Sequence, residues 1–446
     1  MPSPGIKREL VLISPAESHP FIALTLKFFY RRQFPTSLLI LRALTPAEYK
    51  VKVYYRKLFW FKRHFRKGLL VGITCYTSGA HNAYRLAERF RRAGSFVVMG
   101  GPHVTAIPEE ALRYCDSVVI GEAESVWPQV IKDFEKGTLK EKYTGEPLDD
   151  FFSPTLGYFL NKVSPSILLA SGISLSRGCK YHCEFCTLVN IKLRFAPIDS
   201  AIMLISKMKR TGFLTFLNNV LPIYFLDDNI FSSPAHAKEF FRRLIPLKIT
   251  WLSQSSIDIA FDDEALSLAR ESGCLSLFIG FETIYPQRLQ KLRDNNIFST
   301  GDLLAAVKKI KSHGISVMGA FIIGFDDYRH LDYLKLIYFF FRSFWRARFS
   351  VISMTMLTPF PGSVLFERLR KEGRIKTLDW RKYDMLFRVV FHPKTMSAFS
   401  LQVWFWAARI AGIFFSDLGI LIVALYVLYL PMKFMFIFLI RTLTHH

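Results

Sequence analysis

The chain has 446 residues, which is enough for two or three domains that each bury a core of their own. Its 59 Lys and Arg residues outnumber its 36 Asp and Glu residues, and this excess predicts an anionic partner such as a membrane surface or a nucleic acid. Only three of the six cysteines cluster in the sequence, which excludes a disulfide framework and favours a reducing compartment.

Short apolar runs alternate with helical patterns through the first 140 residues. Strands are expected at 9–14, 49–55, 69–74, 96–99 and 117–120, and helices at 37–44, 80–93, 109–113 and 126–136. Repeated strand–helix units of this length form a doubly wound parallel sheet, with ligands beyond the carboxyl ends of the strands. The sequence therefore predicts a Rossmann-like α/β domain over residues 1–140. Residues 141–170 contain three prolines and are expected to form a linker.

A second series of strand–helix units covers residues 171–375. Strands are expected at 173–175, 222–226, 249–254, 275–281, 316–323 and 349–357, and helices at 201–210, 235–244, 263–272, 303–313 and 331–346. About six such units predict a (β/α)6 partial barrel with its active site at the carboxyl ends of the strands. Residues 376–400 are expected to form an extension after the barrel.

Three cysteines with the spacing C-x3-C-x2-C follow the first barrel strand: Cys179, Cys183 and Cys186. Three thiolates on one loop cannot all pair as disulfides, but they can hold one metal centre. A 4Fe-4S cluster usually takes four cysteines, so three would leave one iron open for chemistry. A zinc knuckle with His182 as fourth ligand is the alternative, and it is disfavoured because His182 and Cys183 are adjacent.

This loop resembles the cluster-binding loop of radical S-adenosylmethionine (SAM) enzymes, including the aromatic Phe185 before the third cysteine. The resemblance implies that SAM chelates the open iron and is cleaved to methionine and a 5′-deoxyadenosyl radical, which abstracts hydrogen from a substrate. It also implies an external electron donor such as flavodoxin or ferredoxin.

Polar residues stand where the predicted barrel strands end, and the same resemblance implies SAM contacts for them. Asp227 and Asp228 match a motif that binds the SAM amino group, although they could equally cap the next helix. Glu282 matches a position that bonds the SAM ribose, and Ser253 and Gln254 are further candidates. The sequence identifies no residue that acts directly on a substrate.

The predicted sheet over residues 1–140 resembles the cobalamin-binding domain that precedes many radical SAM barrels. Glycines allow the backbone to approach a large flat ligand, or they simply form tight turns. The stretches at the strand ends nominate a set of cobalamin contacts: Thr74, Ser78, Gly100, Gly101, His103, Thr105, Gly121 and Glu122. The motif Asp-x-His-x-x-Gly is absent after the first strand, so any bound cobalt would lack that axial histidine.

Residues 401–446 are expected to form an apolar helical tail. Asp417 is the only charged residue between Ala411 and Met432, a stretch long enough to span a membrane or to form a shallow hairpin around Pro431. The alternative is a buried helix that docks on the barrel. The tail predicts attachment to the cytoplasmic face of the cell membrane and argues against a nucleic acid partner.

Together these features predict a radical SAM enzyme with 4Fe-4S, SAM and cobalamin cofactors. If cobalamin binds, the resemblance implies C-methylation of a lipid or other hydrophobic substrate, in which SAM methylates the cobalt and a methyl group passes to carbon. Alternatives are radical C–C bond formation, cyclisation or rearrangement of a lipid without methyl transfer. RNA modification, and a sensor that binds the cofactors without turnover, are further classes.

Overall fold

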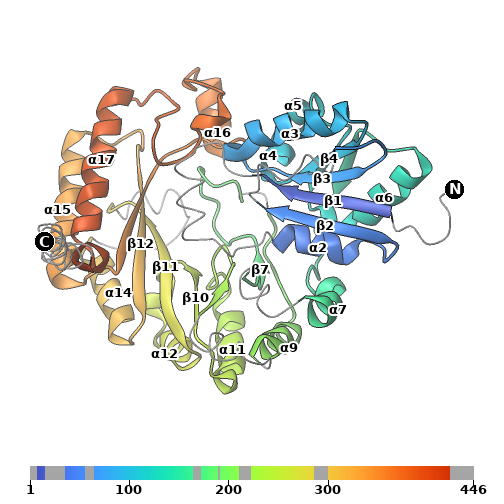
Figure 1. The fold of residues 1–446 in the computed structure, drawn as a ribbon. Helices are drawn as coiled ribbons and strands as arrows, with labels where there is room; N and C mark the ends of the chain where they lie inside the picture. Colours follow the sequence, from blue (N-terminus) through green and yellow to red (C-terminus); the bar gives the residue numbers. More distant parts are fainter. Residues whose placement is uncertain are drawn as a thin grey trace, which may run out of the picture.

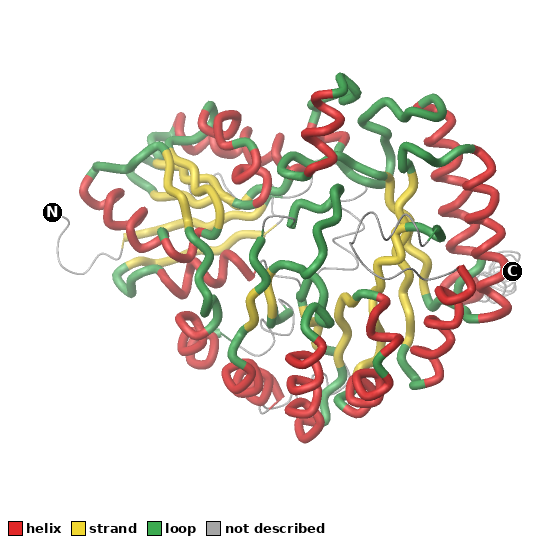
Figure 2. The backbone as a smooth tube through the Cα atoms, turned by 180° about the vertical axis from the view of Figure 1, so that it is seen from behind, coloured by secondary structure: helices red, strands yellow, loops and turns green. Residues whose placement is uncertain are grey.

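The computed structural model describes residues 8–15, 36–55, 65–163, 172–188, 191–209, 222–285 and 300–421, and within them it contains two separate parallel sheets (Figure 1). The smaller body holds the N-terminal sheet, and the larger body holds the barrel strands. Figure 2 shows the barrel helices on the outside of the strands, with loops filling the region between the two sheets.

The N-terminal sheet has six strands in the order β2-β1-β3-β4-β5-β6. They are β1 (Arg8–Ser14), β2 (Tyr49–Tyr55), β3 (Leu70–Thr74), β4 (Phe96–Gly100), β5 (Ser117–Gly121) and β6 (Lys142–Gly145). Its helices are α2 (Thr36–Leu44), η2 (Thr77–Gly79), α3 (Ala80–Arg92), α4 (Pro102–Ala106), α5 (Pro108–Leu112), η3 (Ala123–Ser125) and α6 (Trp127–Lys136). All pairings are parallel, which confirms the predicted doubly wound sheet.

Successive residues of β1 show why the sheet is covered on both faces. Leu10 and Leu12 join a core with Trp127 at the start of α6, whereas Val11 and Ile13 join the core formed with α3. Side chains alternate across a strand, so a continuous apolar run buries both faces.

The predicted linker over residues 141–170 is ordered in its first part. It contains β6, which extends the N-terminal sheet, and α7 (Ser153–Lys162), whose Phe159 is buried in the barrel core. Polar and proline-rich composition suggested a loop, but burial at the sheet edge and against the barrel decides the structure of both elements. Residues 164–171 lie outside the described part of the chain.

The barrel sheet runs in the order β13-β12-β11-β10-β9 with parallel pairing throughout. Its strands are β9 (Ile223–Phe225), β10 (Trp251–Ser255), β11 (Cys274–Glu282), β12 (Ser316–Ile323) and β13 (Val351–Met356). Ile173 adds a parallel bridge to Phe225 at the open edge, in the place of the first predicted strand. The expected partial barrel is therefore confirmed.

Helices follow these strands and cover the outside of the barrel (Figure 1). They are α9 (Ile198–Lys209), α11 (Pro234–Leu244), η4 (Ile245–Leu247), η5 (Ile257–Phe261), α12 (Asp263–Glu271), α14 (Thr300–Ser312), α15 (His330–Arg346) and α16 (Val364–Lys371). Two short strands, β7 (Ser176–Arg177) and β8 (Arg194–Phe195), pair antiparallel at the base of the cysteine loop.

The extension after the barrel ties the two bodies together. Trp380, in η6 (Trp380–Lys382), and Tyr383 are buried in the core of the N-terminal domain, while Phe391 is buried in the barrel core. The indole of Trp380 also donates a hydrogen bond of 2.7 Å to the Glu110 carboxylate. This segment therefore fixes the N-terminal domain against the barrel.

The first part of the predicted apolar tail belongs to the barrel. Helix α17 (Ala398–Phe414) buries Leu401, Phe405 and Ala408, and a Cβ on Gly412 would come within 2.8 Å of Ile352 in β13. The helix ends at Phe414, before Asp417, so the first residues of the stretch 411–432 belong to a helix that docks on the barrel, which was the alternative for the tail. In the described part of the chain, no helix has the length and hydropathy needed to cross a membrane. Residues 422–446 lie outside that part.

Candidate active site

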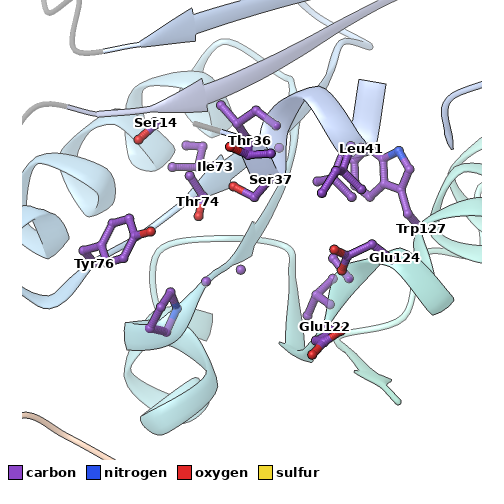
Figure 3. Close-up of a pocket in the computed structure, with 18 of the residues that line it drawn as sticks. Ser14, Thr36, Ser37, Leu41, Ile73, Thr74, Tyr76, Glu122, Glu124 and Trp127 are labelled. Carbon is purple, nitrogen blue, oxygen red and sulfur yellow. The ribbon is translucent and has the colours of Figure 1, made fainter. Parts of the chain in front are cut away.

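A cavity of about 710 Å³ lies where the carboxyl ends of the two sheets meet, and Figure 3 shows many of the side chains around it. The N-terminal sheet contributes residues at the ends of five strands: Ser14, Tyr55, Thr74, Gly100 and Gly121. The barrel side contributes Ser174, Ser176, Arg177, Leu226 and Asp228. Ligands of open parallel sheets bind at this position, near the point where the strand order reverses between β1 and β3.

Helix α2 and the start of α6 form a wall of the cavity that sequence reasoning missed. Thr36, Ser37 and Leu41 of α2 and Trp127 of α6 line it together (Figure 3). The two hydroxyls stand at the beginning of the predicted helix 37–44, but nothing in their pattern distinguishes a ligand contact from a helix start. Tyr76 also lines the cavity and is 57% exposed, so its ring is accessible.

Five of the eight residues nominated for cobalamin line this cavity, namely Thr74, Gly100, Gly101, Gly121 and Glu122. Ser78, His103 and Thr105 do not. His103 is buried, with its Nδ1 3.2 Å from the Thr77 hydroxyl and its Nε2 3.0 Å from the Tyr84 hydroxyl. The expectation for His103 is corrected here, because its ring belongs to the domain core.

Thr105 supports the cavity from behind. Its hydroxyl accepts a hydrogen bond of 3.1 Å from the backbone N–H of Gly121, which has a φ of 80°. A Cβ on Gly121 would lie 2.5 Å from the Gly145 carbonyl oxygen. Gly101 is equally constrained, since its φ is 98° and a Cβ there would lie 2.8 Å from the Thr74 hydroxyl oxygen.

An ion-pair network crosses between the two bodies beside the cavity. Arg177 donates to Glu122 and to Glu124, each at 2.6 Å, and Arg194 pairs with Glu122 as well. The Arg177 guanidinium also lies 4.5 Å from the ring centroid of Phe151. Glu122 is thus held by two arginines at the cavity wall, a role that its position in the sequence did not reveal.

The cysteine loop is fixed at its base and carries the thiols of Cys179, Cys183 and Cys186. Gly178 has a φ of 82°, and a Cβ there would lie 2.6 Å from the Ile191 carbonyl oxygen. The Leu188 N–H donates to the Cys186 sulfur at 3.4 Å, and the Asn229 amide lies 3.9 Å from the Cys179 sulfur. Hydrogen bonds of this kind to the sulfurs are how proteins tune iron–sulfur clusters.

The thiols fit a four-iron cluster by their chemistry. A four-iron cluster takes each cysteine on a different iron, and a loop of three cysteines can supply three of its ligands. Burial raises the pKa of the Cys186 thiol to about 11, with further contributions from the charges of Asp228, Cys179 and Glu282. Coordination to iron would reverse this shift, because a coordinating thiol is deprotonated.

The two adjacent aspartates after β9 have different surroundings. Asp227 is 1% exposed and accepts hydrogen bonds from the Ser176 hydroxyl and, at 3.4 Å, from the Leu175 N–H. Asp228 lines the cavity and accepts from the Gly178 N–H at 3.2 Å. Burial raises the pKa of Asp227 to about 7 and that of Asp228 to about 6. Of the two aspartates nominated for SAM, only Asp228 lines the cavity, whereas Asp227 is bonded to the strand before the cysteine loop.

The remaining SAM candidates, like the two aspartates, differ from one another in their surroundings. The Ser253 hydroxyl is buried and donates to the Phe225 carbonyl at 3.0 Å, so it supports the sheet, while Gln254 is partly exposed. Glu282 ends β11 with a φ of 60°, a conformation that costs a non-glycine residue free energy and that recurs at functional sites. Phe185 packs edge-on against Phe325, with ring centroids 6.4 Å apart.

Comparison with known proteins agrees with this arrangement. Residues 64–131 match the B12 binding domain family, and residues 173–337 match the radical SAM superfamily. The chain is 31% identical over 338 residues to the bacteriochlorophyllide d C-12(1)-methyltransferase of Chlorobaculum tepidum, with 73% of this chain and 71% of that protein covered. It is 25% identical over 369 residues to the hopanoid C-2 methylase of Rhodopseudomonas palustris, with 79% of this chain and 67% of that protein covered.

A solved structure shows the same fold. The radical SAM methyltransferase TsrM from Kitasatospora setae, with cobalamin and a 4Fe-4S cluster bound, superimposes with a TM-score of 0.63 at 17% identity, covering 82% of this chain and 78% of that chain. The two matched domains, the shared fold and the similarity to the bacteriochlorophyllide enzyme lead to one conclusion. The chain belongs to the cobalamin-dependent radical SAM methyltransferases, whose cofactors are a 4Fe-4S cluster, SAM and cobalamin.

Proposed function

We propose that this enzyme transfers a methyl group to a carbon atom of a hydrophobic, polycyclic molecule. The cavity between the two sheets carries the proposal, because Gly100 and Gly101 of the N-terminal domain share it with Arg177 and Asp228 beside the cysteine loop. Methyl transfer needs the cobalamin and the bound SAM to reach the same substrate atom, and one shared cavity meets that need.

The described side chains support binding and orientation around that cavity. The Asp228 carboxylate would attract the SAM ammonium group, and Gly100 and Gly101 would leave room for the flat face of cobalamin. When bound, the cofactors supply the radical and methyl-transfer chemistry. The Arg177 network would hold the N-terminal side and the barrel side of the cavity in fixed positions during the reaction.

The names of the relatives support the substrate class. One acts on a bacteriochlorophyllide and the other on a hopanoid, and both are large, polycyclic and largely hydrocarbon molecules. The apolar sequence of residues 422–432 and the net charge of +23 support a location at the cytoplasmic face of a membrane. The external electron donor, flavodoxin or ferredoxin, stays a prediction.

Expression under anaerobic conditions, with cobalamin supplied, tests this proposal in hosts that make hopanoids or bacteriochlorophyllides. With methionine labelled in its methyl group, pigment or lipid extracts should contain a product that carries the label on carbon. The Cys183→Ala variant, which removes a cluster ligand, is the matched control and should give none. A product that has lost hydrogen without gaining the label would instead indicate cyclisation or another radical rearrangement.

A further inference from the structure

Helix α15 exposes a regular apolar stripe. Leu331, Leu334, Tyr338, Phe341 and Trp345 recur every three or four residues and are between 44% and 72% exposed. Residues at this spacing lie on one face of a helix. The opposite face of α15, with Tyr333 and Phe340, is buried in the barrel core, so the exposed stripe is additional to the packing of the helix.

Helix α17 exposes a second stripe of the same kind. Phe399, Val403, Trp406, Ile410 and Phe414 follow helical spacing and are between 37% and 78% exposed. Its buried face, already described, packs on β13. The two stripes together are called the α15–α17 face below.

The two stripes form one surface because the helices pack side by side in the same direction (Figure 1). Near their starts, Trp404 stacks on Tyr333 with ring centroids 5.6 Å apart. Near their ends, Phe415 lies edge-on to Phe341, also at 5.6 Å. Ten exposed apolar side chains on two neighbouring helices exceed the scattered exposure that is normal for a protein surface, and such patches mark interaction sites.

Positive charge borders the α15–α17 face on both sides. By helical spacing, Lys335, Arg342 and Arg346 lie on the flank of α15 that faces away from α17. Arg409 lies on the far flank of α17 and stacks over Trp406, 5.5 Å from the ring centroid. Its Nη1 is buried and has no hydrogen-bond partner within the described part of the chain. Helix α17 contains no acidic residue.

We propose that the α15–α17 face lies flat in the interface of a membrane that contains anionic lipids. An apolar stripe with aromatic residues and basic flanks is the pattern of helices that bind in this plane, and the basic residues complement lipid phosphates. Ile420 and Leu421, the last described residues of the chain, are exposed, and an uncharged apolar sequence follows to Met432. This contact is distinct from a membrane-spanning tail.

The proposal deepens the proposed function, because it names the surface that would bring the enzyme to a hydrophobic substrate. Helix α15 follows the carboxyl end of β12, so the stripe begins on the catalytic side of the barrel. Membrane binding is measured without substrate, and its failure therefore leaves the methyl transfer proposal standing.

Flotation of the full-length protein with phosphatidylcholine vesicles, with and without phosphatidylglycerol, tests the face. The Leu334→Glu, Tyr338→Glu double variant should bind anionic vesicles at least about tenfold more weakly, because two apolar side chains that would enter the membrane interface are replaced by carboxylates. The Val403→Glu, Ile410→Glu variant should do the same from the other helix. The matched control is Met203→Glu with Phe261→Glu, which changes two equally exposed apolar residues away from this face.

A third variant separates charge from burial. Lys335→Gln with Arg342→Gln should reduce the preference for anionic vesicles and leave binding to neutral vesicles unchanged. Wild-type binding in both stripe variants would overturn the proposal and assign attachment to residues 422–446. Absence of vesicle binding, with a dimer that the stripe variants convert to monomer in light scattering, would overturn it in favour of an interface between two copies.

Discussion

Asp227 and Asp228 stand next to each other in the chain, yet the structure gives them separate tasks. We expect Asp228→Asn to weaken SAM binding at least about tenfold, since a hydrogen bond to a charged group is lost. Asp227→Asn should instead lower the thermal unfolding temperature, because it disturbs the bond to Ser176. Anaerobic calorimetry with SAM, together with thermal unfolding of both variants, compares the two. Equal loss of SAM affinity in both would contradict the division.

The Asp228 carboxylate also predicts that the affinity for SAM depends on pH. Burial raises the pKa of Asp228 to about 6. Above that pH the carboxylate is ionised and attracts the SAM ammonium, and below it the neutral acid does not. SAM affinity should therefore fall as the pH drops through about 6, and Asp228→Asn should remove this step. The measurement is SAM affinity of both proteins over this pH range, and a step that persists in the variant would assign it to another group.

The neighbouring glycines Gly100 and Gly101 at the cavity should respond differently to substitution by alanine. Gly101→Ala should destabilise the N-terminal domain by about 1–3 kcal/mol, because an L residue is strained at this φ. Gly100→Ala is the control, since its Cβ would meet only Val119 at ordinary contact distances of 3.6 Å and more. Urea unfolding should distinguish them, and equal stability of the two variants would contradict the strain argument.

At the residue scale, the sequence predicted which motifs bind cofactors better than it predicted where individual side chains point. The cysteine loop and the strand-end glycines were readable, because their spacing and position are local properties of the chain. His103 and Asp227 were misassigned, because the partners that bury them, Tyr84 and Ser176, are distant in the sequence. Arg177 and Glu124 were missed for the same reason, since their pairing depends on how the two bodies are placed.

Among the elements, β7 and η3 are joined across the cavity by the Arg177 network. Arg177→Met should destabilise the protein by about 2–4 kcal/mol, somewhat less than breaking a fully buried pair costs, because the side chains retain some exposure. Arg381→Met, which breaks an exposed pair with Asp379, is the control and should change stability little. Urea unfolding measures both, and similar effects would show that the network is not specifically stabilising.

Helix α17 provides the test of the corrected C-terminal boundary. Phe405→Ala should cost about 3–5 kcal/mol, the usual cost of removing a large buried aromatic side chain. Phe399→Ala, at a position that is 78% exposed, should leave the thermal unfolding temperature close to wild type. If both variants unfold like the wild type, α17 is not part of the barrel core.

Apolar periodicity predicted most of the strands and helices, because each must bury a face against the others. It could not place α17, because a helix that is apolar on both faces reads equally well as a core helix and as a membrane segment. Nor could it find β6, which is short and polar, or α7, which lies among the prolines of the predicted linker; the structure of both depends on neighbours.

For the whole molecule, the relation between the two bodies matters most. The extension with Trp380 and the Arg177 network both fix the N-terminal domain over the barrel, so the strand ends of both sheets line one cavity. That arrangement could not be predicted from either domain alone. It is what makes methyl transfer between two cofactors and one substrate geometrically feasible.

The most direct test of this account is a cofactor and product analysis of anaerobically purified protein from cells supplied with cobalamin. We expect about four irons per chain, as a three-cysteine loop with an open iron requires, together with bound cobalamin. Incubation with SAM and a reductant should yield S-adenosylhomocysteine and 5′-deoxyadenosine. Cys183→Ala should lose the iron and the 5′-deoxyadenosine. Protein that contains zinc in place of iron, or that retains no cobalamin and forms neither product, would contradict the assignment.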